Sequence, residues 1–215
     1  MIHHFFEPLL SGNYILLDAA RMNQAMEISK DLNPNFNSLY KEKDDPIIQS
    51  VAPFLFIFPH SKEFKDYYFD KGWGNSWGVM IYATAGFDEL SRHFRRFVIV
   101  KSEDGVEFYF RFYDPRVLRV FLPDCDAKQL KAFFGPIHYF LLEDENPDYM
   151  IKFWMENNQL KTEKLLINAK EDPMQPKIQS SAAEIKPEEL QNKAVRQTKI
   201  SESAKPSKPK WNMFE

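Results

Sequence analysis

The stretch from Phe108 to Pro123, FYFRFYDPRVLRVFLP, brings together the residue types that most resemble an active site. Arg111 and Arg116 stand on either side of Asp114, so that one carboxylate has two guanidinium groups within reach. Such charges must be paired or solvated, and Asp114 is the nearest obvious partner for both arginines. The stretch therefore offers either a polar site or an internal ion-pair cluster.

The same aspartate carries a helix-start signal, because Pro115 follows it directly. A carboxylate at this position accepts free amide hydrogens of the first helical turn, and proline loses nothing where an amide has no helical partner. Phe108, Phe110 and Phe112 alternate with other residue types before it, which predicts a strand with one apolar face. We interpret the stretch as a strand that runs into a helix over residues 115–122, with Asp114 and Pro115 mainly structural.

The segment KGWGNSWG, residues 71–78, contains three glycines but lacks the marks of a phosphate-binding loop. It has no lysine-serine pair, no GxGxxG spacing and no strand that ends directly in it. We favour a tight turn that supports the following strand, with Trp73 and Trp77 covering the edge of the core.

No histidine stands at a spacing typical of a zinc site, and the HExxH and CxxC arrangements are absent from the sequence. We therefore expect no metal and no other cofactor. His93, beside Phe94, is expected to be a partly buried surface residue rather than a base. The five histidines are His3, His4, His60, His93 and His138.

Nucleophilic catalysis has no better support. The GxSxG elbow is absent, and the single cysteine, Cys125, lies between two aspartates that would raise its pKa and keep it a thiol. Paired catalytic carboxylates stay open, although the available residues fit loops and helix caps. We expect no enzymatic activity, and a hydrolase or transferase with an unrecognised carboxylate site is the alternative. The carboxylates in question are Asp44, Asp45, Asp124 and Asp126.

Six arginines form the one local concentration of positive charge. Residues 1–167 hold 19 Lys and Arg against 24 Asp and Glu, so an RNA or DNA patch lacks the positive domain it needs. Pairing with carboxylates around a structural junction is favoured over nucleic-acid binding. Because arginine is enriched at protein interfaces, Arg92, Arg95 and Arg96 are candidates for binding a protein partner. The other three are Arg111, Arg116 and Arg119.

The first half of the chain alternates between strand and helix patterns. A strand from Tyr14 to Leu17 ends at Asp18, and a helix follows over residues 19–32 with Met22, Ala25, Met26 and Ile28 spaced for one buried stripe. Residues 54–58 form an apolar run between two prolines, as in a strand buried on both faces. A helix is predicted over residues 61–70, capped by Ser61.

The second half predicts hairpins and two more helices around the opening stretch. Residues 87–97 show helical spacing of apolar residues, and residues 97–113 predict a hairpin with an Asp-Gly turn. A helix that starts at Asp124 or Asp126 stops at Gly135-Pro136, and residues 137–142 form a strand. Residues 149–167 predict a hairpin, although Asn146-Pro147 could start a long helix instead. The pattern is that of an α/β domain with a mixed β-sheet, flanking helices and β-hairpins.

Composition defines where this domain ends. The chain has 215 residues, 44% hydrophobic and 15% aromatic, which is enough for a packed core, and a net charge of -3. Its apolar runs are too short to cross a membrane, and its start lacks the features of a signal peptide, so we expect a cytoplasmic protein that does not bind membranes. One cysteine cannot form an internal disulfide, which fits a reducing compartment.

From about residue 168 bulky apolar residues nearly vanish and Lys, Glu, Gln, Ser and Pro dominate. Such a segment cannot bury enough surface to offset its ordering entropy. We therefore divide the chain into a domain over residues 1–167 and a disordered, flexible tail over residues 168–215. Trp211, Met213 and Phe214 are the exception, and Trp211 and Phe214 are candidates for a terminal docking motif.

The order of several segments resembles one known family. FRFYDPRVLRVFLP and the helix KQLKAFFGPI are preceded by NYILLDAA, SLY, APFLFIF and ELSRHFRRFVIVKSEDG. This order is similar to that of the effector adaptors of bacterial type VI secretion systems, the VgrG-associated chaperones called Tap or Tec. The resemblance covers about residues 14–142, and its most specific phrase is FRFYDPRVL.

The resemblance implies a non-enzymatic role. Such adaptors bind a toxin effector in the cytoplasm and help to load it onto the VgrG spike before firing. The partners it implies are therefore a toxin effector and a VgrG-type spike protein, without nucleic acid or membrane. The family motif carries over onto Arg111, Tyr113, Asp114, Pro115 and Arg116.

Overall fold

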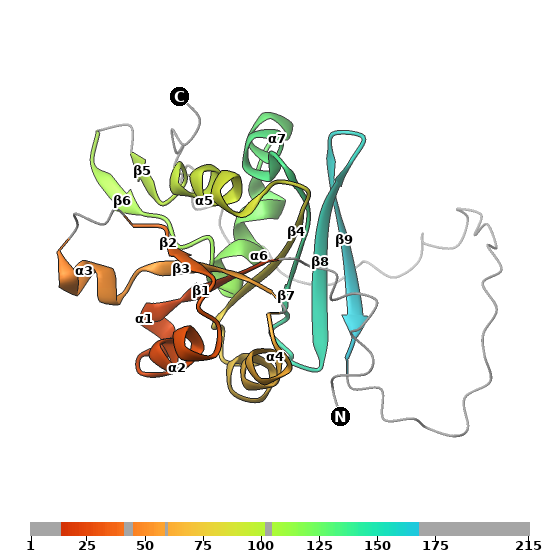
Figure 1. The fold of residues 1–215 in the computed structure, drawn as a ribbon. Coiled ribbons are helices and arrows are strands. Elements are labelled where there is room, and N and C mark those ends of the chain that lie inside the picture. The colour runs from red at the N-terminus through yellow and green to blue at the C-terminus, as the bar shows by residue number, and fades with distance from the viewer. Residues whose placement is uncertain (1–13, 41–44, 59, 102–104, 168–215) are drawn as a thin grey trace, which may run out of the picture. The chain divides into compact units, whose positions relative to one another are not determined.

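The computed structural model describes residues 14–40, 45–58, 60–101 and 105–167, and these form an α/β arrangement, as the sequence predicts (Figure 1). The first half contains β1 (Tyr14–Asp18), α1 (Ala19–Met22), α2 (Ala25–Leu32), β2 (Phe36–Ser38), α3 (Pro46–Ser50), β3 (Pro53–Ile57), α4 (Lys62–Tyr67), the π-helical turn η2 (Tyr68–Gly72) and β4 (Gly78–Ala83). The second half contains α5 (Phe87–Arg95), β5 (Ile99–Lys101), β6 (Glu107–Tyr109), α6 (Pro115–Asp124), α7 (Ala127–Phe134), β7 (Ile137–Glu143), β8 (Tyr149–Glu156) and β9 (Gln159–Leu166).

Seven of the described strands form one sheet in the order β2-β3-β1-β4-β7-β8-β9, and β5 pairs with β6 alone. Every strand pair in the described residues is antiparallel. The hairpin prediction for residues 149–167 is confirmed, since β8 and β9 pair along their full length from Tyr149↔Leu166 to Glu156↔Gln159. The shorter hairpin of β5 and β6 is confirmed as well.

Helices pack against both faces of the large sheet. Phe56, Ile15, Met80 and Leu141 lie opposite one another on successive strands, so they share one face, whereas Phe140, next to Leu141, points to the other. The ring of Phe56 contacts Phe64 of α4, and the ring of Phe140 contacts Phe133 of α7. Helix α4 therefore covers one face, and α7 the opposite one (Figure 1).

The helix starts that the sequence predicts are present. Asp114 accepts a hydrogen bond from the Arg116 amide at 3.0 Å, and Ser61 accepts one from the Phe64 amide at 3.1 Å. Asp126 starts α7 in a reciprocal capping box with Gln129. These caps satisfy amides of the first helical turns that have no partner within the helix.

The helix predicted over residues 19–32 is wrong in its continuity. It is broken into α1 and α2 at Asn23, whose φ of 49° lies in the left-handed region that interrupts a helix. The break rotates the second part, so Met26 and Ser29 are buried while Ile28, predicted to be buried, is 46% exposed.

The strand predicted over the opening stretch is also shorter than expected. Strand β6 ends at Tyr109, and Phe112 and Tyr113 lie in a turn before α6. Both side chains are nevertheless buried, and the Phe112 ring contacts Phe94 of α5 and Phe133 of α7. The aromatic residues of this stretch therefore serve as core contacts between helices rather than as one face of a strand.

Candidate functional site

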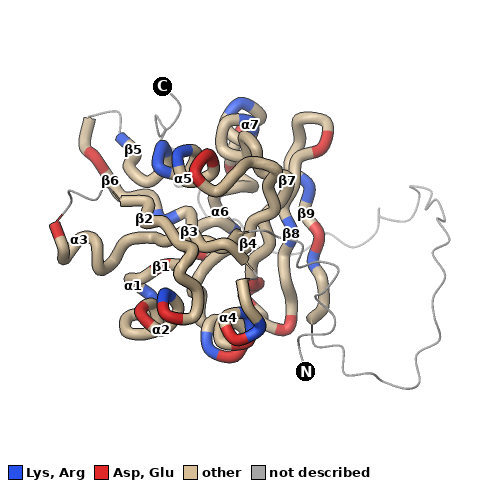
Figure 2. Tube along the Cα trace, viewed as in Figure 1, with Lys and Arg blue, Asp and Glu red and all other residues tan. Residues whose placement is uncertain are grey.

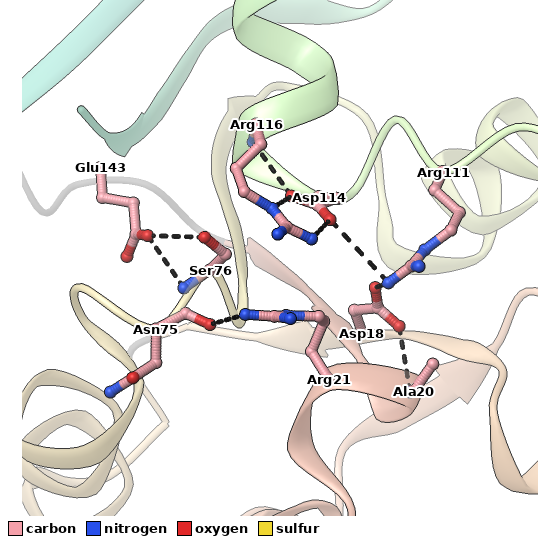
Figure 3. A network of polar contacts seen from close by, with 9 residues as sticks. All are labelled: Asp18, Ala20, Arg21, Asn75, Ser76, Arg111, Asp114, Arg116 and Glu143. Carbon is pink, nitrogen blue, oxygen red and sulfur yellow. Dashed lines mark hydrogen bonds and ion pairs between the residues drawn. The ribbon is translucent and has the colours of Figure 1, made fainter. Parts of the chain in front are cut away.

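The residues of the family motif meet residues from two other parts of the chain at one end of the sheet. We name Asp18, Arg111, Asp114 and Arg116 the motif cluster (Figure 3). Asp18 ends β1, and the other three lie in the turn before α6 and in its first turn. The cluster is therefore built where the ends of a strand and a helix come together, as the sequence suggests for Asp114.

Asp114 and Arg116 form the outer half of the motif cluster. Besides capping α6, the Asp114 carboxylate accepts two side-chain hydrogen bonds from Arg116, at 3.0 Å from Nε and 2.6 Å from Nη2. Burial opposes ionisation of Asp114, but these hydrogen bonds from Arg116 outweigh it and hold the pKa of Asp114 below its ordinary value. The carboxylate is thus ionised, and Arg116 is its main partner.

Asp18 and Arg111 form the inner half. The Arg111 guanidinium contacts the Asp18 carboxylate, which is completely buried, and lies 3.8 Å from that of Asp114. Asp18 also accepts a hydrogen bond from the Ala20 amide at 3.0 Å and so caps α1. Burial raises the pKa of Asp18, and the contacts with Arg111 and Ala20 lower it only in part. The sequence prediction is corrected here, because the main partner of Arg111 is Asp18 and not Asp114.

Two tyrosines extend the cluster. Tyr113, from the motif, and Tyr40, which follows β2, are both buried, and the pKa of each is raised. Burial, together with the neighbouring Tyr40 and the nearby Asp18 charge, raises the pKa of Tyr113 above its ordinary value. A tyrosine in this environment stays protonated, which makes it a structural hydrogen-bond donor rather than a base.

A second buried carboxylate lies beside the motif cluster. Glu143 ends β7 and is 3% exposed, and its carboxylate accepts hydrogen bonds from the Ser76 amide at 2.8 Å and the Ser76 hydroxyl at 3.0 Å (Figure 3). It also accepts one from the Gly74 amide at 2.6 Å. We name Gly74–Ser76 the glutamate loop. Burial raises the pKa of Glu143, and the hydrogen bonds from Gly74 and Ser76 lower it in part. The turn over residues 71–78 therefore binds an anion after all, and that anion belongs to the same chain.

The backbone of the glutamate loop explains its shape. Gly74 and Ser76 have φ values of 80° and 56°, in the left-handed region, and the amides of these two residues both donate to the Glu143 carboxylate. Arg21 of α1 donates a hydrogen bond to the Asn75 carbonyl at 3.2 Å (Figure 3). This bond connects the glutamate loop to α1. The glutamate loop and the motif cluster are thus neighbouring parts of one polar region.

A cavity of about 580 Å³ opens beside Glu143. Arg116, Arg119 and the exposed Val120 of α6 line it on one side, and Ile151 and Phe153 of β8 line it as well. The remaining lining residues are Gly74, Ser76, Glu143, Asp144 and Glu145. The Arg119 guanidinium donates to the Glu143 carbonyl at 2.6 Å, and Asp144 pairs with Lys164. The cavity combines charges of both signs with apolar side chains, so it suits a polar segment or small molecule better than a purely apolar one.

The six arginines of the sequence do not form one patch. Arg92 and Arg95 are exposed on α5, and Arg96, directly after it, is exposed as well; Figure 2 shows positive charge along this helix. Arg111, Arg116 and Arg119 lie around the polar region. Arg92 and Arg96 share a second cavity of about 340 Å³ with Gly135 and Pro136. Arg95 instead donates to the Ser38 carbonyl at 2.8 Å.

His93 holds α5 against the end of α7. Its Nε2 lies 2.8 Å from the Phe133 carbonyl, which can only accept, so Nε2 carries the hydrogen and Nδ1 is free to accept from Arg96 at 2.6 Å. Burial lowers the pKa of His93 and keeps the ring neutral. The residue is 5% exposed, which is more buried than the sequence predicts, and its position between two helices indicates a structural role.

The other residues considered for catalysis lie apart. Burial, with a further contribution from Asp126 and Asp124, raises the pKa of Cys125 to about 12. Asp45 and Asp126 cap α3 and α7, Asp124 is the last residue of α6, and Asp44 lies outside the described residues. Within the part of the chain that the structure describes, no three His, Cys, Asp or Glu side chains come close enough to hold a metal ion.

Sequence reasoning missed two residues of the polar region, Asp18 and Glu143. Asp18 carries the same signal as Asp114, since it stands between an apolar strand and the helix formers Ala19 and Ala20. Glu143 has no such local signal, because its partners lie in a loop 67 and 69 residues away. The two candidates in the tail, Trp211 and Phe214, lie outside the described residues.

No helix of the described residues has the length and apolar character needed to cross a membrane. Comparison with known proteins gives one positive result. The model of the family described as Domain of unknown function (DUF4123) matches residues 13–132, which include the motif cluster and the glutamate loop. No curated protein and no solved structure matches the chain.

Proposed function

Because the chain belongs to the DUF4123 family, which is associated with effector adaptors of type VI secretion systems, we propose that it is an adaptor of this kind. In this proposal the protein is not an enzyme, binds a toxin effector in the cytoplasm and loads it onto a VgrG-type spike protein. The observation that carries the proposal is the family match over residues 13–132, more than half of the chain.

The contacts of the motif support an adaptor over an enzyme. The Asp114 carboxylate accepts three hydrogen bonds from Arg116, counting its amide, and Arg111 holds the buried carboxylate of Asp18. Side chains engaged in this way keep the end of β1 next to the start of α6 and are not available to move protons. Because the motif residues of this family hold the fold together, we expect its members to recognise their partners through other surface residues, which differ from one member to another.

The exposed arginines of α5 are the surface that we propose for the effector. Arg92 is exposed beside the cavity of about 340 Å³ and carries a charge that no described carboxylate pairs at short range. Arg96 lines the same cavity and is held in place by His93. Two guanidinium groups, one of them held by His93, lie beside this concave surface and outnumber the one carboxylate that lines it, Glu89, so the surface suits an acidic segment of a protein partner.

The test is purification of the tagged chain from its native cells, followed by identification of bound proteins. The wild-type chain should retrieve a toxin or a VgrG-type protein. Arg92→Glu should lose the toxin while the free energy of unfolding stays unchanged, and Lys128→Glu on the exposed part of α7 is the matched control that should retain it. Repeated recovery of the wild-type chain alone would contradict the adaptor role, and equal retention by both variants would contradict only the α5 surface.

A hydrolase or transferase is the second candidate, because the cavity of about 580 Å³ contains a buried carboxylate with a raised pKa, Glu143. The amides of Gly74 and Ser76 donate to this carboxyl group and stabilise its ionised form, so they would favour release of its proton to a substrate. Screening of the purified chain against hydrolase substrates decides between the two candidates. Turnover that Glu143→Gln abolishes, at unchanged binding of substrate, would favour the enzyme.

A further inference from the structure

Strand β9 presents the longer of the two strand edges at which the described part of the sheet ends. It is the last strand in the order β2-β3-β1-β4-β7-β8-β9, so described strands pair with one of its edges only (Figure 1). It spans eight residues, whereas β2 at the opposite end of the sheet spans three. Proteins commonly block such an edge with a proline or a bulge. β9 has neither, since its pairing with β8 is continuous and its sequence contains no proline.

A contact at the open end of the β8–β9 hairpin shows which backbone groups of β9 face β8. The Ile167 amide donates to the Asp148 carbonyl at 2.7 Å, and these two residues lie next to the opposed pair Tyr149↔Leu166. In an antiparallel pair only every second residue exchanges hydrogen bonds with the residue opposite it. The residues between them direct their amides and carbonyls to the outer edge. In β9 these are Leu160, Thr162, Lys164 and Leu166, which we name the edge residues.

The turn at the other end of the hairpin gives the same assignment. Asn157 and Asn158 have φ values of 51° and 60°, as in a two-residue type I′ turn. The residues on either side of such a turn, here Glu156 and Gln159, form a hydrogen-bonded pair. Gln159 therefore bonds to β8, and Leu160 is directed outward. The backbone groups of the edge residues are thus positioned to bond a further strand.

The charges on β9 are arranged so that the strand is complementary to itself. Positive and negative side chains follow one another along it (Figure 2). Lys161 and Glu163 lie two residues apart and so point to the same face of the sheet. Neither forms an ion pair within the part of the chain that the structure describes. A strand that runs antiparallel with the same two residues can place a glutamate opposite the lysine and a lysine opposite the glutamate.

We propose that the outer edge of β9 pairs antiparallel with β9 of a second copy of this chain. Edge residues must lie opposite edge residues, because only these can exchange hydrogen bonds across the interface. The two-fold axis of the pair therefore passes through a residue and not between two residues.

The charges select one position of that axis. With the axis at Thr162, Lys161 of each copy lies opposite Glu163 of the other. This pair exchanges no hydrogen bonds, and at such pairs the side chains of two strands come closest. An axis at Lys161, Glu163 or Lys164 would instead place two like charges directly opposite each other, which is unfavourable. The register centred on Thr162 is therefore the one that we expect.

The association should be weak, because one strand pair buries little surface. Interfaces that bury less than about 1,200 Å² are typical of transient complexes. The full chain should accordingly be a monomer at about 1 µM and mainly a dimer at about 500 µM. Sedimentation velocity over this range measures the change, as a rise in average mass from that of one chain toward that of two.

Thr162→Pro tests the edge itself. It removes the amide at the centre of the proposed pair, which β8 does not use, so the dimer should be lost while the hairpin remains. Thr162→Val is the matched control, because it keeps the amide, and it should still dimerise. The melting temperatures of both variants should lie within about 5 °C of the wild type, which shows that the domain is folded.

Charge reversal tests the register. Lys161→Glu and Glu163→Lys should each weaken the dimer about tenfold, because like charges then lie opposite each other in both halves of the interface. An equimolar mixture of the two single variants should dimerise again, since every charge meets its opposite in the mixed pair. The double variant with both changes in one chain should do the same.

Hydrogen exchange identifies the occupant of the edge. The amides of Leu160, Thr162 and Lys164 should be protected only at high protein concentration. Protection that is already complete in the monomer would overturn the proposal, because another segment of the same chain would then occupy the edge. A chain that stays monomeric at 500 µM, a dimer that persists in Thr162→Pro, or a mixture that fails to recover would overturn it as well. These outcomes do not depend on whether the chain is an adaptor.

Discussion

The Arg111 guanidinium contacts the buried carboxylate of Asp18, although 93 residues separate the two along the chain. Asp18 ends β1 and caps α1, and Arg111 lies in the turn that leads into α6. The ion pair therefore joins the first strand of the domain to the helix that follows the family motif.

Arg111→Ala should lower the free energy of unfolding by about 2–4 kcal/mol. Loss of one partner of a buried ion pair costs about 3–5 kcal/mol because the other charge is left buried, and the partial exposure of Arg111 reduces that figure. Urea denaturation of both proteins measures the difference. The double variant Arg111→Met with Asp18→Asn should recover part of the lost stability, because it leaves no unpaired charge. If the free energy of unfolding of Arg111→Ala lies within about 0.5 kcal/mol of the wild-type value, which is about the measurement error, the ion pair is not structural.

Asp114→Ala should lower the free energy of unfolding by about 0.5 to 2 kcal/mol, because α6 loses its cap. Arg116→Ala is the matched control and should cost less than about 1 kcal/mol, since that side chain is 49% exposed. Thermal denaturation of the two variants separates capping from ion pairing. Unchanged stability of Asp114→Ala together with lost partner binding would assign the residue to recognition instead.

Glu143→Gln should change the pH dependence of stability. Burial raises the pKa of folded Glu143 above the ordinary value of 4.5, so the folded state holds its proton at a pH where the unfolded state has lost it. Stability of the wild type should therefore fall as pH rises from 4.5 through the folded pKa, and that decrease should be missing in Glu143→Gln. Urea denaturation midpoints of both proteins are measured at several pH values between about 4.5 and 7.5, the range in which the raised pKa acts. The difference in midpoint between the wild type and Glu143→Gln should become smaller as pH rises. A constant gap would mean that Glu143 titrates normally.

Gly78→Ala should destabilise the domain by about 3 kcal/mol or more, because a Cβ at this position would lie 1.9 Å from the Leu16 carbonyl oxygen. Strands β1 and β4 pair at this point, so relief of the clash requires separation of two central strands. Gly86→Ala makes the same chemical change where nothing lies within 4 Å, and it should cost less than about 1 kcal/mol. Equal melting temperatures for both variants would contradict the close approach of the strands.

Removal of residues 211–215 should leave the melting temperature within about 2 °C of the full chain, because the described core residues pack extensively on one another. Any effect should appear in binding alone, measured as the amount of partner protein retrieved with the truncated chain. A large drop in melting temperature would place these residues in the folded core.

Local signals predicted much of this fold. Aspartate or serine before a helix former marks the starts of α4, α6 and α7, because a cap acts within three residues of itself. The aromatic and β-branched content of residues 149–167 favoured the β8–β9 hairpin, because such side chains fit a pleated strand. The break at Asn23 was not predicted, because one residue of positive φ leaves no trace in the spacing of apolar residues.

In the candidate site, too, the sequence predicted the contacts between neighbouring residues but not the contacts between distant ones. From the sequence alone came the family resemblance, the capping role of Asp114 and its pairing with Arg116, two residues away. Only the tertiary structure showed that Arg111 pairs with Asp18 and that the glutamate loop encloses Glu143. The physical reason is the range of the interaction: a cap or a neighbouring ion pair is defined by adjacent residues, whereas a buried carboxylate takes its partners from whichever strands and loops the fold brings beside it.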